Sequence, residues 1–481
     1  MIIYLTPGLE DDGIFSLTHF NFEVMKMPKA RLVPPRFKIP TKHAIRSCLD
    51  MDAQLATLRH GFESLPDTRS RDGQIPLADI LMSAYAMFAL KDRSLLAFDE
   101  RRRLDADNLK RIFGITQIPC DTQMRSVLDP LDPELFRPFF RSAVAQLQRG
   151  KALQQLAFYQ GCYLLSLDGT GSFESKELSS ASCLVKKHRN GTTSYYQQVL
   201  GAALVHPDRQ EVIPLAPEMI IQQDGATKND CERNAARRLL AKFREDYPRL
   251  PVIVIEDGLS SNGPHIRDLR HHNCHYILGA KPGDHPLLFH NLDEALKSKT
   301  ATTFAMKDGK KPEITHTFRF LNETQLNLSN PDLKVNFLVY EEHNSKTGKT
   351  QHFSWVTDFL ITEENAYILM RGGRARWKIE NETFNTLKNQ GYHFEHNFGL
   401  GKEHLSEVFV MVMMLAFLID QIQQLCSPLF QAAWQRAGSK QELWDEQRHL
   451  FHSFELDSMA MIYTAIVNGF KRQKLVIIYD E

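Results

Sequence analysis

Two short apolar segments, each followed closely by an aspartate and a glycine, place the strongest limits on the fold. Residues 163–167 run into Asp168, and residues 252–255 run into Glu256 and Asp257. Apolar runs of this kind are typical of strands buried on both faces in an α/β protein. Both aspartates are therefore predicted to mark strand ends, where such proteins build their sites. For either aspartate alone, an ordinary turn before glycine is the competing interpretation.

A third acid stands in a segment with helical spacing, residues 376–388. Arg376, Glu380, Phe384 and Lys388 follow one another at intervals of four, so on an α-helix they share one face with a drift of about 40° per step. A carboxylate flanked by cations suits phosphodiester chemistry, because Glu380 would hold a divalent cation while the basic groups take phosphate oxygens. A solvated helix with one Arg–Glu pair is the alternative.

With these three acids in context, the chain resembles a bacterial insertion-sequence transposase of the DDE type, a family with a ribonuclease H-like catalytic core. The resemblance extends over about residues 119–421. It lies near the group whose third acid belongs to a Tyr-x2-Arg-x3-Glu-x6-Lys signature. Arg376 and Glu380 fit that spacing, and residues 377–379 match the usual interior of the signature.

Two positions depart from the signature. Gly373 stands where the tyrosine is expected, and Leu387 stands where the lysine is expected, with Lys388 one residue later. On an α-helix a shift of one residue turns a side chain by about 100° around the axis. Lys388 would then reach the side of Glu380 only through its long side chain.

The resemblance implies two-metal catalysis on DNA. Asp168, Asp257 and Glu380 would meet in one cleft, and because like charges this close repel unless cations neutralise them, we expect two Mg2+ (or Mn2+) ions. Asp168 would bridge the ions, while Asp257 and Glu380 would each anchor one, so that a water or a DNA 3′-hydroxyl is activated and the leaving oxygen is stabilised. The implied partner is double-stranded DNA, both the terminal inverted repeats of the element and the target, bound by a homodimer.

Candidate DNA contacts are Arg376, Lys388, Lys378, Lys281 and Trp355. Lys281 follows a predicted core strand and would touch phosphate, although a surface lysine is the simpler account. Trp355 lies in a predicted β-rich segment and would stack on a displaced base, although a strand tryptophan is more often part of the core.

The expected fold class is α/β. Three strands are followed by helix, strand, helix and strand, which is the ribonuclease H-like order, and a β-rich insertion precedes Glu380. In that order the first and fourth strands are neighbours, which would bring Asp168 and Asp257 together. The expected divisions are an extended arm or linker (1–41), an α-helical DNA-binding domain (42–155), the first part of the core (156–285), the β-rich insertion (286–362), the second part of the core (363–425) and a C-terminal helical region (426–481).

The N-terminal domain carries a helix-turn-helix outline. Residues 108–115 would form a short helix ended by Gly114, and Asp121 would cap a second helix that runs through Leu128. Pro119 lengthens the turn between them, so general DNA contact by this domain is favoured over sequence-specific readout by this element.

Charge balance, cysteine spacing and the length of the longest apolar run limit the class of protein. The 58 basic and 58 acidic residues cancel, so any basic DNA-binding surface must be local. Seven cysteines without CxxC pairs indicate a reducing compartment. The longest apolar run, residues 408–419, is shorter than the ~20 residues of a membrane span and is predicted to be a buried helix. These features predict a cytoplasmic protein with no membrane partner, and the resemblance to insertion-sequence transposases implies that it is associated with the bacterial nucleoid.

Other interpretations stay open. Residues 271–275 are rich in histidine, but a strand that begins there would send alternate side chains to opposite faces, which argues against a metal role. Residues 475–479 could be an edge strand or a dimer contact. A metal-dependent nuclease without strand transfer, and a non-catalytic DNA-binding relic of a transposase, are the alternative functions.

Overall fold

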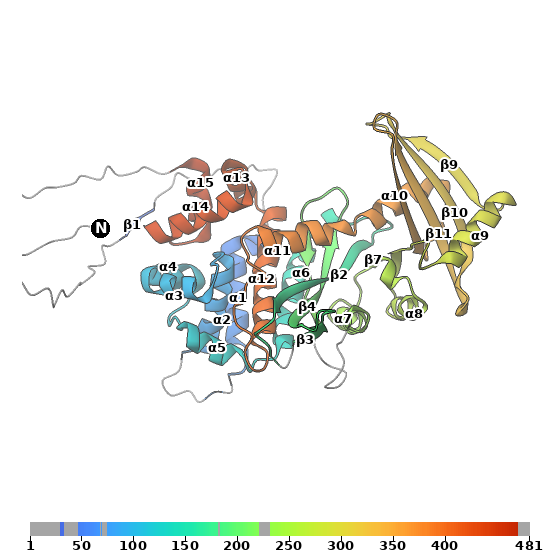
Figure 1. Cartoon of the computed structure of the whole chain (residues 1–481). Helices are drawn as coiled ribbons and strands as arrows, with labels where there is room; N and C mark the ends of the chain where they lie inside the picture. The colour runs from blue at the N-terminus through green and yellow to red at the C-terminus, as the bar shows by residue number, and fades with distance from the viewer. Residues whose placement is uncertain are drawn as a thin grey trace, which may run out of the picture.

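The protein is an elongated molecule with a helical end, a central α/β region and a β-rich end (Figure 1). Most of the predicted arm, and residues 475–479 at the C-terminal end, lie outside the part of the chain that the structure describes. The computed structural model describes residues 29–32, 47–67, 69, 75–180, 183–220 and 231–469.

Helices from both ends of the chain form one helical unit (Figure 1). Asn108 donates to the backbone oxygens of Phe451 and Phe454, each at 2.7 Å, and Met459 N–H donates to Asp52 at 2.8 Å. The predicted C-terminal helical region therefore packs on the N-terminal domain. The helices of this helical unit are α1 (Met51–Glu63), α2 (Leu77–Ala89), α3 (Leu95–Leu104), α4 (Ala106–Phe113), α5 (Asp121–Leu128), α6 (Arg137–Arg149), α13 (Pro428–Ala437), α14 (Lys440–Ser453) and α15 (Met459–Asn468).

The two helices of the predicted helix-turn-helix outline are present. Gly114 ends α4 with φ +67°, a left-handed conformation that glycine adopts without strain. The N-cap of α5 is Cys120 rather than Asp121, which is the first residue of the helix. Arg111 in α4 forms ion pairs with Glu455 and Asp457 at 3.4 and 3.5 Å, so this cation is partly neutralised within the protein.

The central helix α12 (Leu405–Cys426) joins the helical unit to the sheet. It is long and apolar enough to cross a membrane, but 94% of its apolar window is buried inside the protein, which confirms the predicted buried helix. Asp129, just after α5, accepts hydrogen bonds from the backbone N–H of Lys402, Glu403 and Leu405 at 2.9–3.1 Å. The loop before α12 is thus fixed to the N-terminal domain.

One mixed sheet of 11 strands runs through the core and into the β-rich end, in the order β3-β4-β2-β7-β8-β12-β11-β10-β9. β7 is parallel to β2 and β8, and β4 is antiparallel to β2. The core strands are β2 (Tyr163–Ser175), β3 (Leu184–Lys187), β4 (Thr193–Val205), β7 (Val252–Glu256) and β8 (His275–Gly279), with the short β5 (Ile213–Pro214) and β6 (Glu218–Ile220) paired to β4. The third strand of the expected order is thus present as two short strands.

The β-rich insertion continues the core sheet. Trp355 of β12 pairs with Gly279 of β8, so the insertion is joined edge to edge to the core. Helix α9 (Pro286–Lys297) opens the segment that was predicted to be β-rich throughout, and it packs against β10. The strands are β9 (Thr302–Lys307), β10 (Ile314–Asn327), β11 (Asn330–Asn344) and β12 (Lys349–Thr357).

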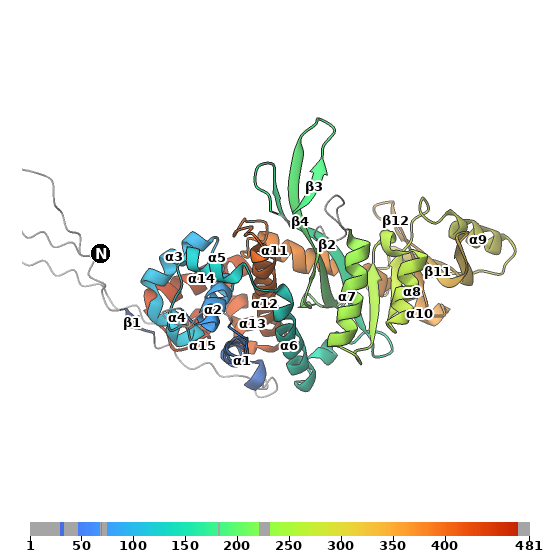
Figure 2. The ribbon, with the colours of Figure 1, turned by 90° about the horizontal axis from the view of Figure 1, so that it is seen from below.

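Helices α7 (Glu232–Asp246) and α8 (Gly263–His271) pack together beside the core strands (Figure 2). One face of α7 packs inward, and its buried residues follow helical spacing: Ala235, Ala236, Leu239, Leu240 and Phe243.

The third acid lies in a helical run that crosses the middle of the molecule (Figure 1). This run consists of α10 (Glu363–Arg374), a π-helix η6 (Ile379–Phe384) and α11 (Asn385–Asn389). The prediction of one regular α-helix over residues 376–388 is wrong, because a π-helical turn interrupts it directly at Glu380.

Candidate active site

The strand register brings the first two acids together. Pairing of β2 with β7 ends at Ser166 opposite Ile255, and two residues further along each strand lie Asp168 and Asp257. Neighbouring strands lie about 4.8 Å apart, so the two residues start from adjacent backbone positions. Asp257 also caps the 3-10 turn η5 (Gly258–Ser260), since its Oδ1 accepts from Leu259 N–H at 2.9 Å.

Asp168 does not end its strand, contrary to the prediction. β2 continues to Ser175 because it stays paired with β4, and Asp168 lies opposite Gly201 there. It marks instead the point where the pairing with β7 stops. Arg376 Nη1 donates to Asp168 Oδ2 at 3.0 Å, and Gly169 N–H donates to Oδ1 at 3.0 Å.

Burial raises the pKa of Asp168, and the negative charges of Asp257 and Glu380 raise it further. Arg376 and the Gly169 N–H oppose this shift in pKa but do not cancel it. The three predicted acids therefore act on one another electrostatically, as expected of groups that face a common site.

Glu380 is placed by packing of its helix on the sheet. A Cβ atom at Gly201 would lie 2.7 Å from Cε1 of Phe384 and 3.6 Å from Cδ1 of Ile379. Only glycine allows η6 to approach the sheet this closely, opposite Asp168. Because Ile379 and Phe384 face inward, Glu380 between them is exposed to solvent.

The π-helix accounts for the displaced lysine. A π-helical turn holds about one more residue than an α-helical turn, because its hydrogen bonds run from i to i+5. Lys388, eight residues after Glu380, therefore takes about the angular position that the seventh residue has on an α-helix, within roughly 20° of Glu380. The predicted 100° displacement does not arise. Leu387 is buried, and Lys388 forms an ion pair with Glu395 at 2.8 Å.

Trp355 explains the missing tyrosine of the signature. A Cβ atom at Gly373 would lie 2.5 Å from Cε2 of Trp355, so the indole fills the space that a tyrosine at this position would need. Trp355 is 5% exposed, and its ring stacks on Phe353 with centroids 5.9 Å apart. The structure places Trp355 in the core, whereas the stacking role stays a prediction that would require this ring to leave its position.

Lys281 and Lys378, two further predicted DNA contacts, lie on different sides of the three acids. The stem of Lys281 lies against Gly258, with its Cγ 3.5 Å from a Cβ placed there, so this lysine is beside the Asp257 turn. Lys378 forms an ion pair with Glu382 at 3.7 Å and lines a separate groove of about 540 Å3 between the insertion and the helical run.

A fourth acid in the site was not predicted. Glu232, the first residue of α7, lines a cleft of about 500 Å3 together with Asp168 and Asp257. A Cβ atom at Gly169 would lie 2.6 Å from its Cδ, so the glycine makes room for this carboxylate. Burial raises the pKa of Glu232, as do the charges of Asp168 and Asp257. An acid in the first turn of a helix is common for dipole reasons alone, so the sequence held no specific signal.

Below Asp257 lies a buried acid–histidine pair. Glu256 and His265 are both buried, and Glu256 Oε2 lies 2.5 Å from His265 Nε2. Burial alone would lower the pKa of His265, but the Glu256 carboxylate overrides it and the net shift of that pKa is upward. Ser260 donates to Glu256 at 3.1 Å, so the pair fixes the turn that holds Asp257.

The donor set has the chemistry of a Mg2+ or Mn2+ site. Asp168, Asp257 and Glu380 offer only carboxylate oxygens, the ligands that these hard cations prefer. Within the described ranges, no three His, Cys, Asp or Glu side chains lie close enough together to hold a metal ion as they stand. The fit of the three acids to a divalent cation thus rests on the chemistry of their oxygens and on the repulsion between their charges, which a bound cation would relieve.

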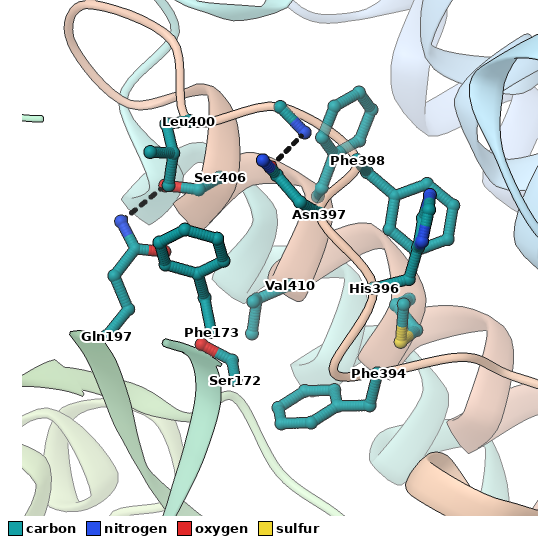
Figure 3. Close-up of a pocket in the computed structure, with 13 residues that line it drawn as sticks. Ser172, Phe173, Gln197, Phe394, His396, Asn397, Phe398, Leu400, Ser406 and Val410 are labelled. Atoms are coloured by element: carbon teal, nitrogen blue, oxygen red, sulfur yellow. Dashed lines mark hydrogen bonds between the residues drawn. The ribbon is translucent and has the colours of Figure 1, made fainter. Parts of the chain in front are cut away.

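Two further features lie away from the acids. His275, in the histidine-rich segment, bonds to Asp358 at 2.7 Å. A pocket of about 30 Å3 lies between the β2–β4 hairpin and the loop before α12 (Figure 3). There Gln197 Nε2 donates to Ser406 at 2.8 Å, and Phe173 and Phe394 contribute aromatic walls. This pocket has room for about one water molecule and is therefore too small for a substrate. The hydrogen bond beside it joins the two segments instead.

Comparison with known protein families matches one part of the chain. Residues 185–418 match the family model described as "Transposase DDE domain", a stretch that includes Asp257 and Glu380 and begins after Asp168. No curated protein matches the chain. The match supports placing the chain, over this stretch, with the DDE transposase family.

Proposed function

We propose that the protein is a metal-dependent DDE transposase that binds the ends of an insertion sequence, cleaves the DNA there and joins the 3′-hydroxyl ends to target DNA. The observation that supports the proposal is the position of the three acids on the fold. Asp168 and Asp257 start from adjacent strands through the β2–β7 register, and the π-helix that carries Glu380 packs through Phe384 on Gly201, opposite Asp168.

Each residue has a role in this proposal. Asp168, Asp257 and Glu380 would hold the Mg2+ or Mn2+ ions, which, when bound, activate the attacking oxygen and stabilise the leaving one. Arg376 is the cation in contact with the acids and would donate to a phosphate oxygen. Lys388, brought to the side of Glu380 by the π-helix, and Lys281, beside the Asp257 turn, would contact phosphates next to the reacting one.

The type of core, the oligomeric state and the place of action belong to the same proposal. We infer a ribonuclease H-like core, supported by antiparallel β2 and β4 followed by parallel β7 and β8. We also infer a homodimer on DNA that acts in the bacterial cytoplasm at the nucleoid, with the helical unit binding the terminal inverted repeats.

Strand cleavage and joining on DNA that carries the element's own ends test this function. The unaltered protein should cut only with Mg2+ or Mn2+, and Glu380→Gln should lose cutting while it still binds the ends. Glu382→Gln, two residues away on the same π-helix, is the matched control and should cut normally. Equal cutting by Glu380→Gln would refute the site. Cutting without joining would identify a nuclease, and binding without cutting by the unaltered protein would identify a relic.

A further inference from the structure

A basic β-hairpin stands beside the acids and is not explained by the site itself. β2 runs on past Asp168 to Ser175, and β3 and β4 continue the same sheet, so that the hairpin extends away from the rest of the molecule (Figure 2). No acidic residue occurs from Leu178 to Pro207, whereas Lys186, Lys187 and Arg189 all lie in this stretch. This stretch of a chain with no net charge is therefore positive because it lacks acids, and not because its cations are unusually dense.

These cations differ from those around Glu380. Arg376 pairs with Asp168, Lys388 with Glu395, and Arg374 with Glu342, at 3.0, 2.8 and 2.7 Å. Lys186, Lys187 and Arg189 are exposed, and within the described part of the chain they form no ion pair. Cations without a counter-charge in the protein are free to bind an external anion at no cost in broken ion pairs.

The tip of the hairpin is already ordered. His188 N–H donates to Thr192 O at 2.8 Å, and Gly191 N–H donates back to His188 O at 3.0 Å. Gly191 has φ +81°, which glycine adopts without strain. His188 also bonds to Ser194 at 2.9 Å. Because the turn is closed by these bonds, little backbone entropy is lost when the tip binds a partner.

Register connects the basic residues to the acidic cleft. Lys186 lies opposite Ser194 on β4, and residues opposite each other in an antiparallel pair share a face of the sheet. Tyr196 and Gln198, two and four residues further along that face, line the cleft with Asp168 and Asp257. Lys187, opposite Thr193, projects to the other face, which is the face that Gly201 and Asp168 share, so the hairpin carries cations on both faces of this sheet.

The spacing along β4 gives a distance in nucleotides. Seven residues separate Gly201, opposite Asp168, from Ser194, opposite Lys186. At ~3.3 Å per residue the two positions lie up to about 23 Å apart, which is about seven nucleotides at ~3.4 Å per phosphate along one strand.

We propose that the β3–β4 hairpin is a DNA-binding element in which Lys186, Lys187 and Arg189 bind backbone phosphates about seven nucleotides from the bond that is cut. This inference rests on the proposed function for the identity of the anion, which is duplex DNA. The bound segment belongs either to the element and its flank or to the target, and the contacts to phosphate are the same in both cases.

The test compares Lys186→Ala/Lys187→Ala with Arg249→Ala/Lys299→Ala in the whole chain. Arg249 and Lys299 are exposed, lie outside the hairpin and the helical unit, and form no ion pair within the described residues. Binding to a duplex of about 40 base pairs is followed by fluorescence anisotropy in chelator over a series of salt concentrations. Each lost phosphate contact lowers the slope of log K against log salt by about 0.9, so the hairpin variant should lose nearly two and the control none.

Equal slopes for the two double variants would overturn the proposal. Because chelator prevents metal-dependent cutting, this result is independent of catalysis, and cutting by the unaltered protein with Mg2+ is measured separately as the test of the proposed function. Circular dichroism checks that both variants are folded, and Lys186→Gln/Lys187→Gln, which keeps the length of the side chains, should repeat the loss of slope.

Trimmed duplexes identify which DNA is bound. If element DNA supplies the phosphates, then trimming one side of the cleavage site to fewer than about seven nucleotides removes the difference between the unaltered protein and the hairpin variant. If target DNA supplies them, trimming has no effect on that difference, and joining to target falls about tenfold while cutting is retained. If neither trimming nor joining distinguishes the variant, the hairpin does not contact DNA at this position.

Discussion

The two acids on the sheet and the acid on the helix are held in different ways. Asp168 and Asp257 are fixed by the backbone of adjacent strands, at the point where the pairing of β2 with β7 ends. Glu380 depends instead on the contact of Phe384 and Ile379 with Gly201. A strand register cannot shift by one residue without turning every side chain to the other face, whereas a helix seated on one glycine can slide. The difference indicates two carboxylates in rigid positions and one carboxylate in an adjustable position.

Changing the length of each acid by one methylene should expose this difference. Asp168→Glu and Asp257→Glu should each lose cleavage by about a thousandfold or more, since the backbone cannot withdraw to restore the carboxylate position. Glu380→Asp should lose about 10–100-fold, because its helix can move toward the sheet. The rates are measured as single-turnover cleavage with Mn2+. Losses of the same size at all three positions would refute the division into rigid and adjustable acids.

A methyl group at Gly201 should disturb the helix-borne acid specifically. Gly201→Ala places Cβ 2.7 Å from the Phe384 ring, so η6 must move away from Asp168, and cleavage should fall about tenfold or more. Gly171→Ala in the adjacent strand is the matched control, because its nearest neighbour is the Gln197 oxygen at 3.9 Å. Thermal unfolding of both variants shows whether the loss is local. Normal cleavage by Gly201→Ala would show that the helix does not need this close contact.

Sequence was sufficient for the elements that rest on local patterns. The strand at residues 252–255 was predicted because all its residues are apolar, and it is confirmed as Val252–Glu256. Asp257 follows its strand as predicted, and the predicted adjacency of the strands that carry Asp168 and Asp257 is confirmed by the pairing of β2 with β7.

The remainder depends on contacts between distant segments. Residues 169–175 are polar and rich in glycine and serine, and they form a strand only because β4 pairs with them. The π-helix has no signature in the sequence that we used, and its first and last residues, Ile379 and Phe384, both lie against Gly201 of a distant strand. Glu232 becomes part of the site only because residue 169 is a glycine. In each case a residue far away in the sequence decides the local structure.

Exchanging Leu387 and Lys388 should show whether the signature helix is regular or contains the π-helical turn. If the helix were regular, Leu387→Lys/Lys388→Leu would restore the signature spacing and be tolerated. Because of the π-helix, the exchange instead puts a lysine at a buried position and should cost about 3 kcal/mol in free energy of unfolding. Urea denaturation measures this cost. Lys388→Ala is the control, and since it removes only a partly exposed pair it should cost less than about 1 kcal/mol. A stable exchange variant would contradict the assigned register.

The smallest expected effect is a dependence of stability on pH at the sheet-borne acid. Burial and the charges of Asp257 and Glu380 raise the pKa of Asp168, so above its ordinary value of 3.8 the folded protein holds this proton longer than the unfolded chain does. The contribution of Asp168 to stability is therefore most favourable at low pH and falls as pH rises through its folded pKa. The unaltered protein should lose stability relative to Asp168→Asn between pH 4 and pH 7, measured by urea denaturation in chelator.

Asp129 should show a pH dependence of the opposite sign. Burial raises the pKa of Asp129, but hydrogen bonds from backbone N–H groups at the start of α12 lower that pKa by more, so the net shift is downward. Its contribution is present at neutral pH and is lost as pH falls, so Asp129→Asn should show the reverse trend. A trend of the same sign for both variants would contradict the raised pKa of Asp168. It would mean that Asp257 and Glu380 lie too far from Asp168 to affect its charge.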